Sequence, residues 1–252
     1  MKQIVVYFVG IAGSGKTYLT KAFSDWLDSR RVDHLTINLD PGADYVPYSA
    51  DIDVREWFTL EDVMQKYNVG PNGAQIICSD LLVTLLDDIK FEMDLANPSF
   101  VLIDTPGQME IFTLRESSKV IVEALGRERS AMVFLFDPVV SKTPLGFLSQ
   151  LFMANSAIFR LEIPQINVLS KCDTLREDEL ERILRWSQDV DYLGTFLEKK
   201  TLSLELFRAL KDAGFFRPLI PVSAVNGYGL EDIYDGLQEF FYGGEDIERV
   251  IF

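Results

Sequence analysis

A glycine-rich run at residues 10–17, Gly-Ile-Ala-Gly-Ser-Gly-Lys-Thr, ends in a lysine and a threonine. The glycines let consecutive backbone N–H groups point at one phosphate, and Lys16 can then reach the β- and γ-phosphate oxygens. The Thr17 hydroxyl suits Mg²⁺, and the apolar stretch 3–9 directly before the run predicts a strand that leads into a helix. We expect this loop to bind a nucleoside triphosphate through Ala12, Gly13, Ser14, Gly15, Lys16 and Thr17.

Two aspartates follow apolar stretches that are typical of buried strands. Asp40 comes directly after residues 34–39, and Asp104 comes directly after residues 100–103. An aspartate at the end of such a strand is a common contact of Mg²⁺ in enzymes that act on nucleoside triphosphates. We therefore expect the metal near Thr17, Asp40 and Asp104, with Asp40 acting on it through a water or else orienting the attacking water.

The residues after Asp104 suit the far end of a triphosphate. Gly107 has an N–H group that can meet the γ-phosphate, and Gln108 follows it directly. Gln108 therefore competes with Asp40 for the role of orienting the attacking water. Lys16 would stabilise the charge on the phosphates during transfer.

A second group of residues indicates which nucleotide base the site binds. Residues 170–173, Ser-Lys-Cys-Asp, follow one apolar stretch, and Ser223 and Ala224 follow another. The Asp173 carboxylate can accept hydrogen bonds from N1–H and the 2-amino group of guanine, which adenine does not offer, while the Lys171 stem packs along the ring. The tetrapeptide alone would also suit an ordinary exit from a strand. Found after the other motifs in chain order, it favours a guanine site.

The elements that must hold these residues alternate between strand and helix. Near-continuous apolar runs are typical of a parallel sheet that is covered on both faces, and its ligands bind at the carboxyl ends of the strands. We predict one α/β domain over residues 1–252, with a doubly wound, mostly parallel sheet of the P-loop NTPase type. The predicted strands are 3–9, 34–39, 100–103, 130–136, 165–169 and 217–222, and helices are predicted at 16–29, 143–159 and 229–241.

A long insertion, residues 41 to about 98, separates the second predicted strand from the third. Helices are predicted in it at about 60–67 and 74–96. Thr59 and Asp62 have the spacing of a capping box and would begin the first of these helices.

Composition restricts the partners and the compartment. The net charge of −15 argues against direct binding of nucleic acid, because phosphate backbones require basic patches. The two cysteines, Cys78 and Cys172, lie far apart and favour a reducing compartment. No apolar run approaches the ~18 residues of a membrane span and the sequence shows no export signal, so we expect a cytoplasmic protein without a membrane anchor.

Taken together, these motifs closely resemble the GPN-loop GTPases, archaeal members in particular. The resemblance implies a dimeric P-loop NTPase of the SIMIBI-like class that hydrolyses GTP to GDP and phosphate with Mg²⁺. It further implies a homodimer in which each Gly-Pro-Asn loop enters the site of the partner. Eukaryotic members are linked to RNA polymerase assembly, so an assembly or switch role with a protein client is implied as well. The residues that carry the resemblance are Gly10–Thr17, Asp40-Pro41-Gly42, Asp51-Ile52-Asp53-Val54-Arg55, Gly70-Pro71-Asn72, Asp104–Gln108 and Ser223-Ala224.

Two positions bear on affinity and catalysis. Ser170 stands where the family has asparagine, so we expect the amide that braces the phosphate loop to be missing and nucleotide affinity to be reduced. Ile11 stands where related dimeric enzymes often have a second lysine, so another group must stabilise the γ-phosphate. By resemblance the first candidate is Asn72 of the partner subunit, and the second is Arg55.

Arg55 has two interpretations. It can approach the γ-phosphate, or it can form a salt bridge with a neighbouring acid such as Asp51 or Asp53. It also bears on a different enzyme class, a small-molecule kinase, which would need a lid with several arginines. Arg55 is the single arginine of the insertion, so the sequence favours a GTPase over a kinase.

Overall fold

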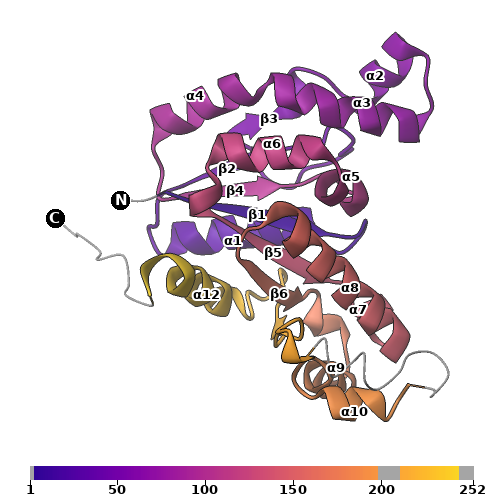
Figure 1. The fold of residues 1–252 in the computed structure, drawn as a ribbon. Helices are drawn as coiled ribbons and strands as arrows, with labels where there is room; N and C mark the ends of the chain where they lie inside the picture. The colour runs from indigo at the N-terminus through magenta and orange to yellow at the C-terminus, as the bar shows by residue number, and fades with distance from the viewer. Residues whose placement is uncertain (1–2, 198–210, 244–252) are drawn as a thin grey trace.

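The computed structural model of the protein describes residues 3–197 and 211–243. In this part of the chain, seven parallel strands form one sheet in the order β3-β2-β4-β1-β5-β6-β7 (Figure 1). The sheet is covered by helices, so the predicted doubly wound α/β fold is confirmed. The strands are β1 (Ile4–Gly10), β2 (His34–Asn38), β3 (Ile52–Asp53), β4 (Phe100–Asp104), β5 (Ser130–Phe136), β6 (Gln165–Leu169) and β7 (Ile220–Pro221).

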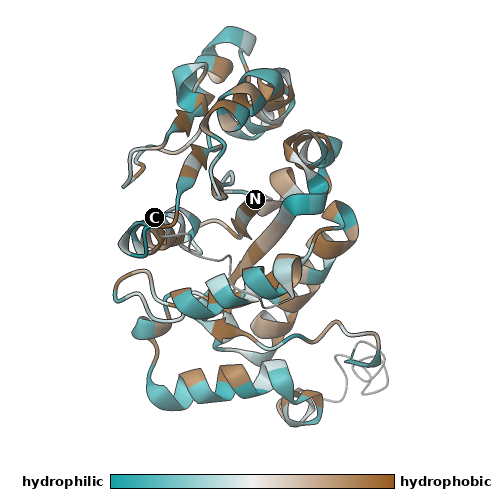
Figure 2. Cartoon of the chain, turned by 90° about the vertical axis from the view of Figure 1, so that its left-hand side faces the viewer, coloured by the Kyte–Doolittle hydropathy of each residue, from teal (hydrophilic) through white to brown (hydrophobic). Residues whose placement is uncertain are grey.

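Strand β1 lies at the centre of the sheet and shows why the sequences of these strands are apolar without a break. It pairs with β4 and β5, and every residue from Ile4 to Gly10 is buried. Alternate side chains enter two separate cores, with Tyr7 in one and Phe8 in the other. Figure 2 shows hydrophobic residues along the central strands and hydrophilic residues gathered on the surrounding helices.

The helices divide between the two faces. Helices α1 and α12 pack on the core that contains Phe8, and α6 and α8 pack on the core that contains Tyr7. No helix of the described residues is both long and apolar enough to cross a membrane. The helices are α1 (Lys16–Ser29), α2 (Leu60–Tyr67), α3 (Pro71–Thr84), α4 (Leu86–Ala96), α5 (Met109–Leu114), α6 (Glu116–Leu125), α7 (Pro138–Ser141), α8 (Pro144–Leu161), α9 (Glu177–Gln188), α10 (Val190–Gly194) and α12 (Leu230–Tyr242).

The insertion differs from its prediction in two ways. The helix expected over 74–96 is two helices, because α3 ends at Thr84, Leu85 connects them, and α4 begins at Leu86. In addition α3 begins at Pro71, since proline favours the first position of a helix. The insertion also contributes β3, a strand of two residues that was not predicted because it is too short to show an apolar pattern.

Other elements follow the sequence closely. The capping box of Thr59 and Asp62 begins α2, and the Thr143 hydroxyl caps α8. Strand β7 is shorter than the predicted 217–222, since proline cannot donate a hydrogen bond to a neighbouring strand. Helices α5, α6, α7, α9 and α10 lie outside the predicted set.

Helices α2 and α3 form a unit that projects beyond the sheet (Figure 1). A small core of Val63, Ala74 and Cys78 joins the two helices. Helix α3 is tied to α6 by the Ser79 and Ser117 hydroxyl groups, 2.6 Å apart. The insertion is therefore attached to the helix layer that follows β4.

Candidate nucleotide-binding site

The phosphate loop connects β1 to α1, as predicted. A Cβ atom on Gly10 would lie 2.7 Å from Ser14 Oγ and 2.8 Å from the Leu135 carbonyl oxygen, so only glycine fits there. Gly15 adopts the left-handed conformation, with φ of 96°, and places the start of α1. No described side chain caps this helix, so its first N–H groups are available to a phosphate.

Lys16 lies across the phosphate loop. Its Nζ donates hydrogen bonds to the carbonyl oxygens of Gly10 at 2.9 Å, Ile11 at 3.2 Å and Gly107 at 3.2 Å. The ammonium group is therefore held at the mouth of the loop by backbone oxygens. Phosphate oxygens would replace these contacts when a nucleotide binds.

Asp104 has the surroundings of a magnesium ligand. Burial raises the pKa of this carboxyl to about 7, although the hydroxyl of Thr17 and the charge of Lys16 oppose the rise. Its Oδ2 accepts a hydrogen bond from the Tyr48 hydroxyl at 3.4 Å, while Oδ1 is buried and has no hydrogen-bond partner among the described residues. A buried carboxylate beside a hydroxyl fits a hard cation.

The described residues contain no group of three His, Cys, Asp or Glu side chains that could hold a metal. Thr17 and Asp104 would hold Mg²⁺ together with groups from outside the protein, as this metal commonly needs few protein ligands when it binds with a phosphate. The predicted metal residues are thus compatible with Mg²⁺ when a nucleotide is bound.

Asp40 forms a hydrogen bond with Gly107, the residue that was predicted to contact the γ-phosphate. Its Oδ2 accepts a hydrogen bond from the Gly107 N–H at 3.0 Å, and its Oδ1 accepts one from the Gly42 N–H at 2.9 Å. Burial raises the pKa of Asp40, and these two hydrogen bonds oppose the rise. The charge of Asp40 in turn raises the pKa of Asp104, so the two carboxyl groups are neighbours.

A cavity of about 230 Å³ lies beside Asp40. It brings together Ala12 of the phosphate loop, Asp40, Gly107 and Gln108, which confirms that these segments meet as the sequence predicted. Helix α3 closes the cavity, and Gln75 on that helix has a buried side-chain oxygen with no hydrogen-bond partner in the described part of the chain. The other lining residues are Pro41, Gly42, Leu60, Cys78, Ser79, Leu82, Pro106 and Ile111.

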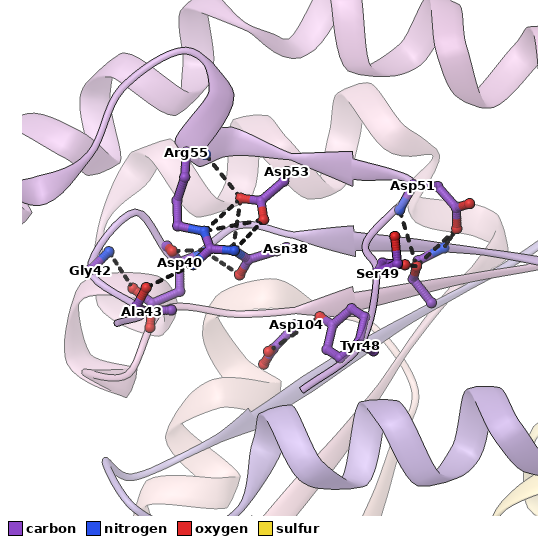
Figure 3. A network of polar contacts seen from close by, with 11 residues as sticks. Asn38, Asp40, Gly42, Ala43, Tyr48, Ser49, Asp51, Asp53, Arg55 and Asp104 are labelled. Carbon is purple, nitrogen blue, oxygen red and sulfur yellow. Dashed lines mark hydrogen bonds and ion pairs between the residues drawn. The ribbon is translucent and has the colours of Figure 1, made fainter. Parts of the chain in front are cut away.

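Arg55 forms the salt bridge that was one of its two predicted roles (Figure 3). Its Nη2 lies 2.6 Å from Asp53 Oδ2, its Nε lies 2.9 Å from Asp53 Oδ1, and its Nη1 donates to the Ala43 carbonyl oxygen at 2.9 Å. Burial raises the pKa of Asp53, but the hydrogen bonds from Arg55 outweigh this effect and hold the pKa of Asp53 below its usual range. Arg55 therefore anchors the loop after β2, and a role at the γ-phosphate stays a prediction.

The same loop is held at its far end by Asp51. The Asp51 carboxylate accepts hydrogen bonds from the Thr36 N–H at 2.7 Å and from the Thr36 hydroxyl at 2.8 Å. Figure 3 shows this contact, the Arg55 salt bridge and the Tyr48–Asp104 contact along one stretch of chain. The loop of residues 41–51 is thus attached to β2, β3 and β4.

A second cavity, of about 270 Å³, lies where guanine was predicted to bind. Lys171 and Asp173 from the end of β6 line it, together with Ala224 from the segment after β7. The Lys171 Nζ donates to the Gly13 carbonyl oxygen and lies 3.3 Å from Asp137 Oδ2. The structure therefore brings the predicted base-reading residues against the phosphate loop.

Ser170 corrects one expectation. Its hydroxyl donates to the Ser14 carbonyl oxygen at 2.7 Å and contacts the Phe136 carbonyl oxygen at 3.0 Å. The phosphate loop is therefore braced by the serine, although the longer amide is absent. Ser223 is fully buried, and its hydroxyl accepts a hydrogen bond from the Val225 N–H at 3.2 Å, so it shapes the loop that carries Ala224.

The Gly-Pro-Asn tripeptide lies at the beginning of α3. Gly70 precedes the helix in an extended conformation, Pro71 is its first residue, and Asn72 is exposed. Asn72 is absent from the described residues that line the two cavities. The structure therefore does not bring Asn72 into the site of its own chain.

Tyr48, Gln75 and Asp137 were missed by the sequence analysis. Asp137 follows β5 directly, and the same signal that selected Asp40 and Asp104 could have found it. Tyr48 and Gln75 lie outside any strand-end pattern, and no local signal marks them.

Comparisons with known proteins agree with this geometry. A family model described as "Conserved hypothetical ATP binding protein" matches residues 8–243. The GPN-loop GTPase PAB0955 of Pyrococcus abyssi is 35% identical over 242 residues, which are 91% of this chain and 94% of the relative. The GPN-loop GTPase QQT2 of Arabidopsis thaliana is 30% identical over 246 residues, which are 91% of this chain and 62% of that protein.

Solved structures show the same fold. The crystal structure of PAB0955, a GTPase in apo form from Pyrococcus abyssi, has a TM-score of 0.82 and 34% identity and covers 95% of this chain and 98% of its own. Chloroplast FtsY from Physcomitrella patens, at 13% identity and a TM-score of 0.50, covers 94% of this chain and 65% of its own and shares the fold alone.

The family description refers to ATP, whereas the relatives are named for GTP. Asp173 beside the second cavity is the residue type that distinguishes guanine from adenine, so the site agrees with the relatives. The match over residues 8–243 and the similarity to PAB0955 show that this chain belongs to the GPN-loop GTPase family and is a GTPase.

Proposed function

We propose that this GTPase acts as a homodimer that hydrolyses GTP to GDP and phosphate with Mg²⁺, each protomer completing the site of the other. The observation that carries the proposal is the lining of the 230 Å³ cavity, which contains no lysine or arginine among the described residues. Arg55 is engaged by Asp53, and Ile11 offers no charge. A further donor for the γ-phosphate, in addition to Lys16 and the Gly107 N–H, would therefore come from outside this set.

Asn72 of the partner subunit is that donor in our proposal. It is exposed at the start of α3, and an amide can donate to a phosphate and accept from a water. Pro71 stiffens the tripeptide and makes α3 begin directly after Gly70. The projecting unit of α2 and α3 provides the reach that delivery to another subunit requires (Figure 1).

The remaining roles follow from the positions of the side chains. Thr17 and Asp104 would hold Mg²⁺, which neutralises phosphate charge when it is bound, and Lys16 would contact the β- and γ-phosphates. Asp40 and Gln108 line the cavity beyond the γ-phosphate and are the two groups that can orient a water there. Lys171, Asp173 and Ala224 would hold guanine.

The wider biological role is a nucleotide-controlled switch or assembly factor with a protein client. A slow GTPase whose 41–98 insertion is tied to the γ-phosphate side would change the order of that insertion when the phosphate is lost. The family's link to RNA polymerase assembly suggests the kind of client. Hydrogen exchange of residues 41–98 in the GTP-analogue and GDP states tests the switch, and identical protection in both states would contradict it.

Source and compartment belong to the same proposal. The relative from Pyrococcus abyssi is 35% identical and the Arabidopsis relative is 30% identical, which supports an archaeal type of chain. Two buried free cysteines, Cys78 and Cys172, support a cytoplasmic location.

Mixed dimers test the delivery of Asn72. A protomer with Lys16→Ala has a damaged phosphate loop but an intact Asn72, and a protomer with Asn72→Ala has the reverse. Mixing them should restore part of the hydrolysis, because Asn72 of the Lys16→Ala protomer enters the intact phosphate site of the Asn72→Ala protomer. A donor of this kind is worth ~2.7–4 kcal/mol of barrier, so each parent dimer should be slow enough for rescue to be visible.

The matched control is Gln65→Ala, an exposed residue of α2 in the same projecting unit. This variant should keep full activity as a pure dimer. Mixed dimers confirmed by native mass spectrometry that show no rescue would mean that Asn72 does not act across the dimer. Release of phosphate without an added acceptor separates the GTPase from a small-molecule kinase.

A further inference from the structure

Two charged side chains hold the backbone of Gly107 on both sides of its Cα atom. Its N–H donates to Asp40 Oδ2 at 3.0 Å, and its carbonyl oxygen accepts from Lys16 Nζ at 3.2 Å. The N–H of Gly107 and the ammonium of Lys16 are the two groups that a γ-phosphate would use. The structure shows them already engaged by the protein itself.

Asp40 is a chemical substitute for a phosphate at this point. A carboxylate carries a negative charge and accepts hydrogen bonds from backbone N–H groups, as a phosphate oxygen does. Both of its oxygens are used, one by Gly107 and one by Gly42. A γ-phosphate and this carboxylate compete for the Gly107 N–H, because one amide has one hydrogen and the two negative charges repel each other at the same donor.

We propose that Asp40 is a specificity-determining residue that competes with the γ-phosphate for the Gly107 N–H and thereby lowers affinity for GTP relative to GDP. GDP has no phosphate at that position and leaves the Asp40–Gly107 hydrogen bond in place. GTP binds only by displacing the carboxylate. This inference rests on the proposed placement of the γ-phosphate at Gly107.

The cavity beside Asp40 has space for its carboxylate when the γ-phosphate displaces it. Asp40 lines the 230 Å³ cavity, so rotation of its side chain away from Gly107 has space on that side. The Gly42 N–H is bonded to the same carboxylate, and Arg55 holds the next residue through the Ala43 carbonyl oxygen. Displacement of Asp40 therefore acts directly on the beginning of the 41–51 loop.

The consequence is a readout of the γ-phosphate by the loop. In the GDP state Asp40 links this loop to the segment between β4 and α5, across 67 residues of sequence. In the GTP state that link is broken and the carboxylate is free to contact a water in the cavity. One residue would thus discriminate between the nucleotides and then enter the position from which it can orient water.

Binding of GDP and of the non-hydrolysable analogue β,γ-imido-GTP to Asp40→Asn tests the competition. Asparagine keeps the shape but removes the charge, and it has one oxygen where Asp40 has two. The ratio of the analogue Kd to the GDP Kd should fall about tenfold, which corresponds to about 1.4 kcal/mol. Asp44→Asn is the matched control, because it removes one exposed negative charge from the same loop.

The control should change the ratio by less than about twofold, because charges separated by solvent are screened. An equal fall in both variants would mean that general electrostatics sets the ratio, and it would overturn the inference. No fall in Asp40→Asn would overturn it as well.

The Gly107 amide gives an independent measurement. In glycine-labelled protein its NMR signal should shift in Asp40→Ala without nucleotide, stay near the nucleotide-free position with GDP, and move with the GTP analogue. No shift in nucleotide-free Asp40→Ala would overturn the inference. If the Gly107 signal of wild type does not move when the GTP analogue binds, the proposed placement of the γ-phosphate is wrong. If the signal moves but the Kd ratio of Asp40→Asn is unchanged, only the competition is contradicted.

Discussion

Replacement of Asp104 by asparagine should stabilise the nucleotide-free protein while it removes the carboxylate that we propose as a ligand of Mg²⁺. Asp104 is 1% exposed, and burial raises its pKa from the ordinary 3.8 to about 7. A group whose folded-state pKa is raised in this way binds more protons when folded than when unfolded between these two values. Stability from this group therefore falls as the pH rises from about 4 to about 7.

The magnitude follows from the size of the shift. The difference between 3.8 and about 7 corresponds to roughly 4 kcal/mol of destabilisation above pH 7, as an upper value. Asparagine is neutral at every pH and avoids this cost. Its amide nitrogen would lie near the unpartnered position of Oδ1, however, and an unsatisfied buried donor costs roughly 1–3 kcal/mol. The net gain at pH 8 is therefore about 1–3 kcal/mol.

Thermal unfolding with a chelator and without nucleotide measures this gain. For a chain of this size 1 kcal/mol shifts Tm by about 2–4 °C, so Asp104→Asn should unfold several degrees higher at pH 8. At pH 5 the gain should be smaller by roughly 3 kcal/mol, because the wild-type carboxyl is then largely protonated in the folded state. Asp44→Asn, which removes an exposed carboxylate, is the matched control.

Addition of Mg²⁺ and a GTP analogue should reverse the order of the two proteins. The metal would bind the carboxylate of wild type more strongly than the neutral amide, so wild type should gain more stability from it. A gain in stability for Asp104→Asn that is equal at pH 5 and pH 8 would refute the conclusion that burial raises the pKa of Asp104.

Three further substitutions separate the roles of other residues. Arg55→Ala removes the hydrogen bond to the Ala43 carbonyl oxygen, so hydrogen exchange in the loop after β2 should rise and Tm should fall by a few degrees; unchanged exchange would show that Arg55 does not anchor the loop. Ser170→Ala removes a hydrogen bond to Ser14 worth about 1 kcal/mol, so competition assays should show GTP and ATP weakened alike. Asp173→Ala should instead narrow the gap between GTP and ATP, and equal affinity for the two nucleotides in wild type would overturn the guanine assignment.

The part of the site that the sequence predicts is the part in which each residue follows a strand. Asp40, Asp104 and Asp173 stand at or just beyond the ends of apolar runs, and parallel strands bring such ends to one edge of the sheet. Strands buried on both faces must be apolar throughout, so the runs themselves are visible in the sequence.

The part that the sequence does not predict depends on contacts between distant segments. The Tyr48–Asp104 contact joins residues 56 positions apart, and the Ser170–Ser14 hydrogen bond joins residues 156 positions apart. Neither pair has a local pattern, because the fold alone decides which loops meet. The break at Leu85 was missed for a related reason, since its neighbours have ordinary helix propensities and packing decides where α3 gives way to α4.

Most charged side chains of the nucleotide site are engaged within the chain before any nucleotide binds, whereas the buried Asp104 contacts the neutral Tyr48 hydroxyl. Lys16 and Asp40 meet through Gly107, Lys171 lies beside Asp137, and Arg55 is paired with Asp53. A buried charge without a partner would be costly, so this pairing allows the folded protein to exist with an open phosphate site. In the proposed mechanism, nucleotide binding would exchange contacts inside the protein for contacts with phosphate. The exchange at Gly107 would release the segments that follow β2 and β4. These segments flank the 41–98 insertion, so the exchange would act on the unit that carries Asn72.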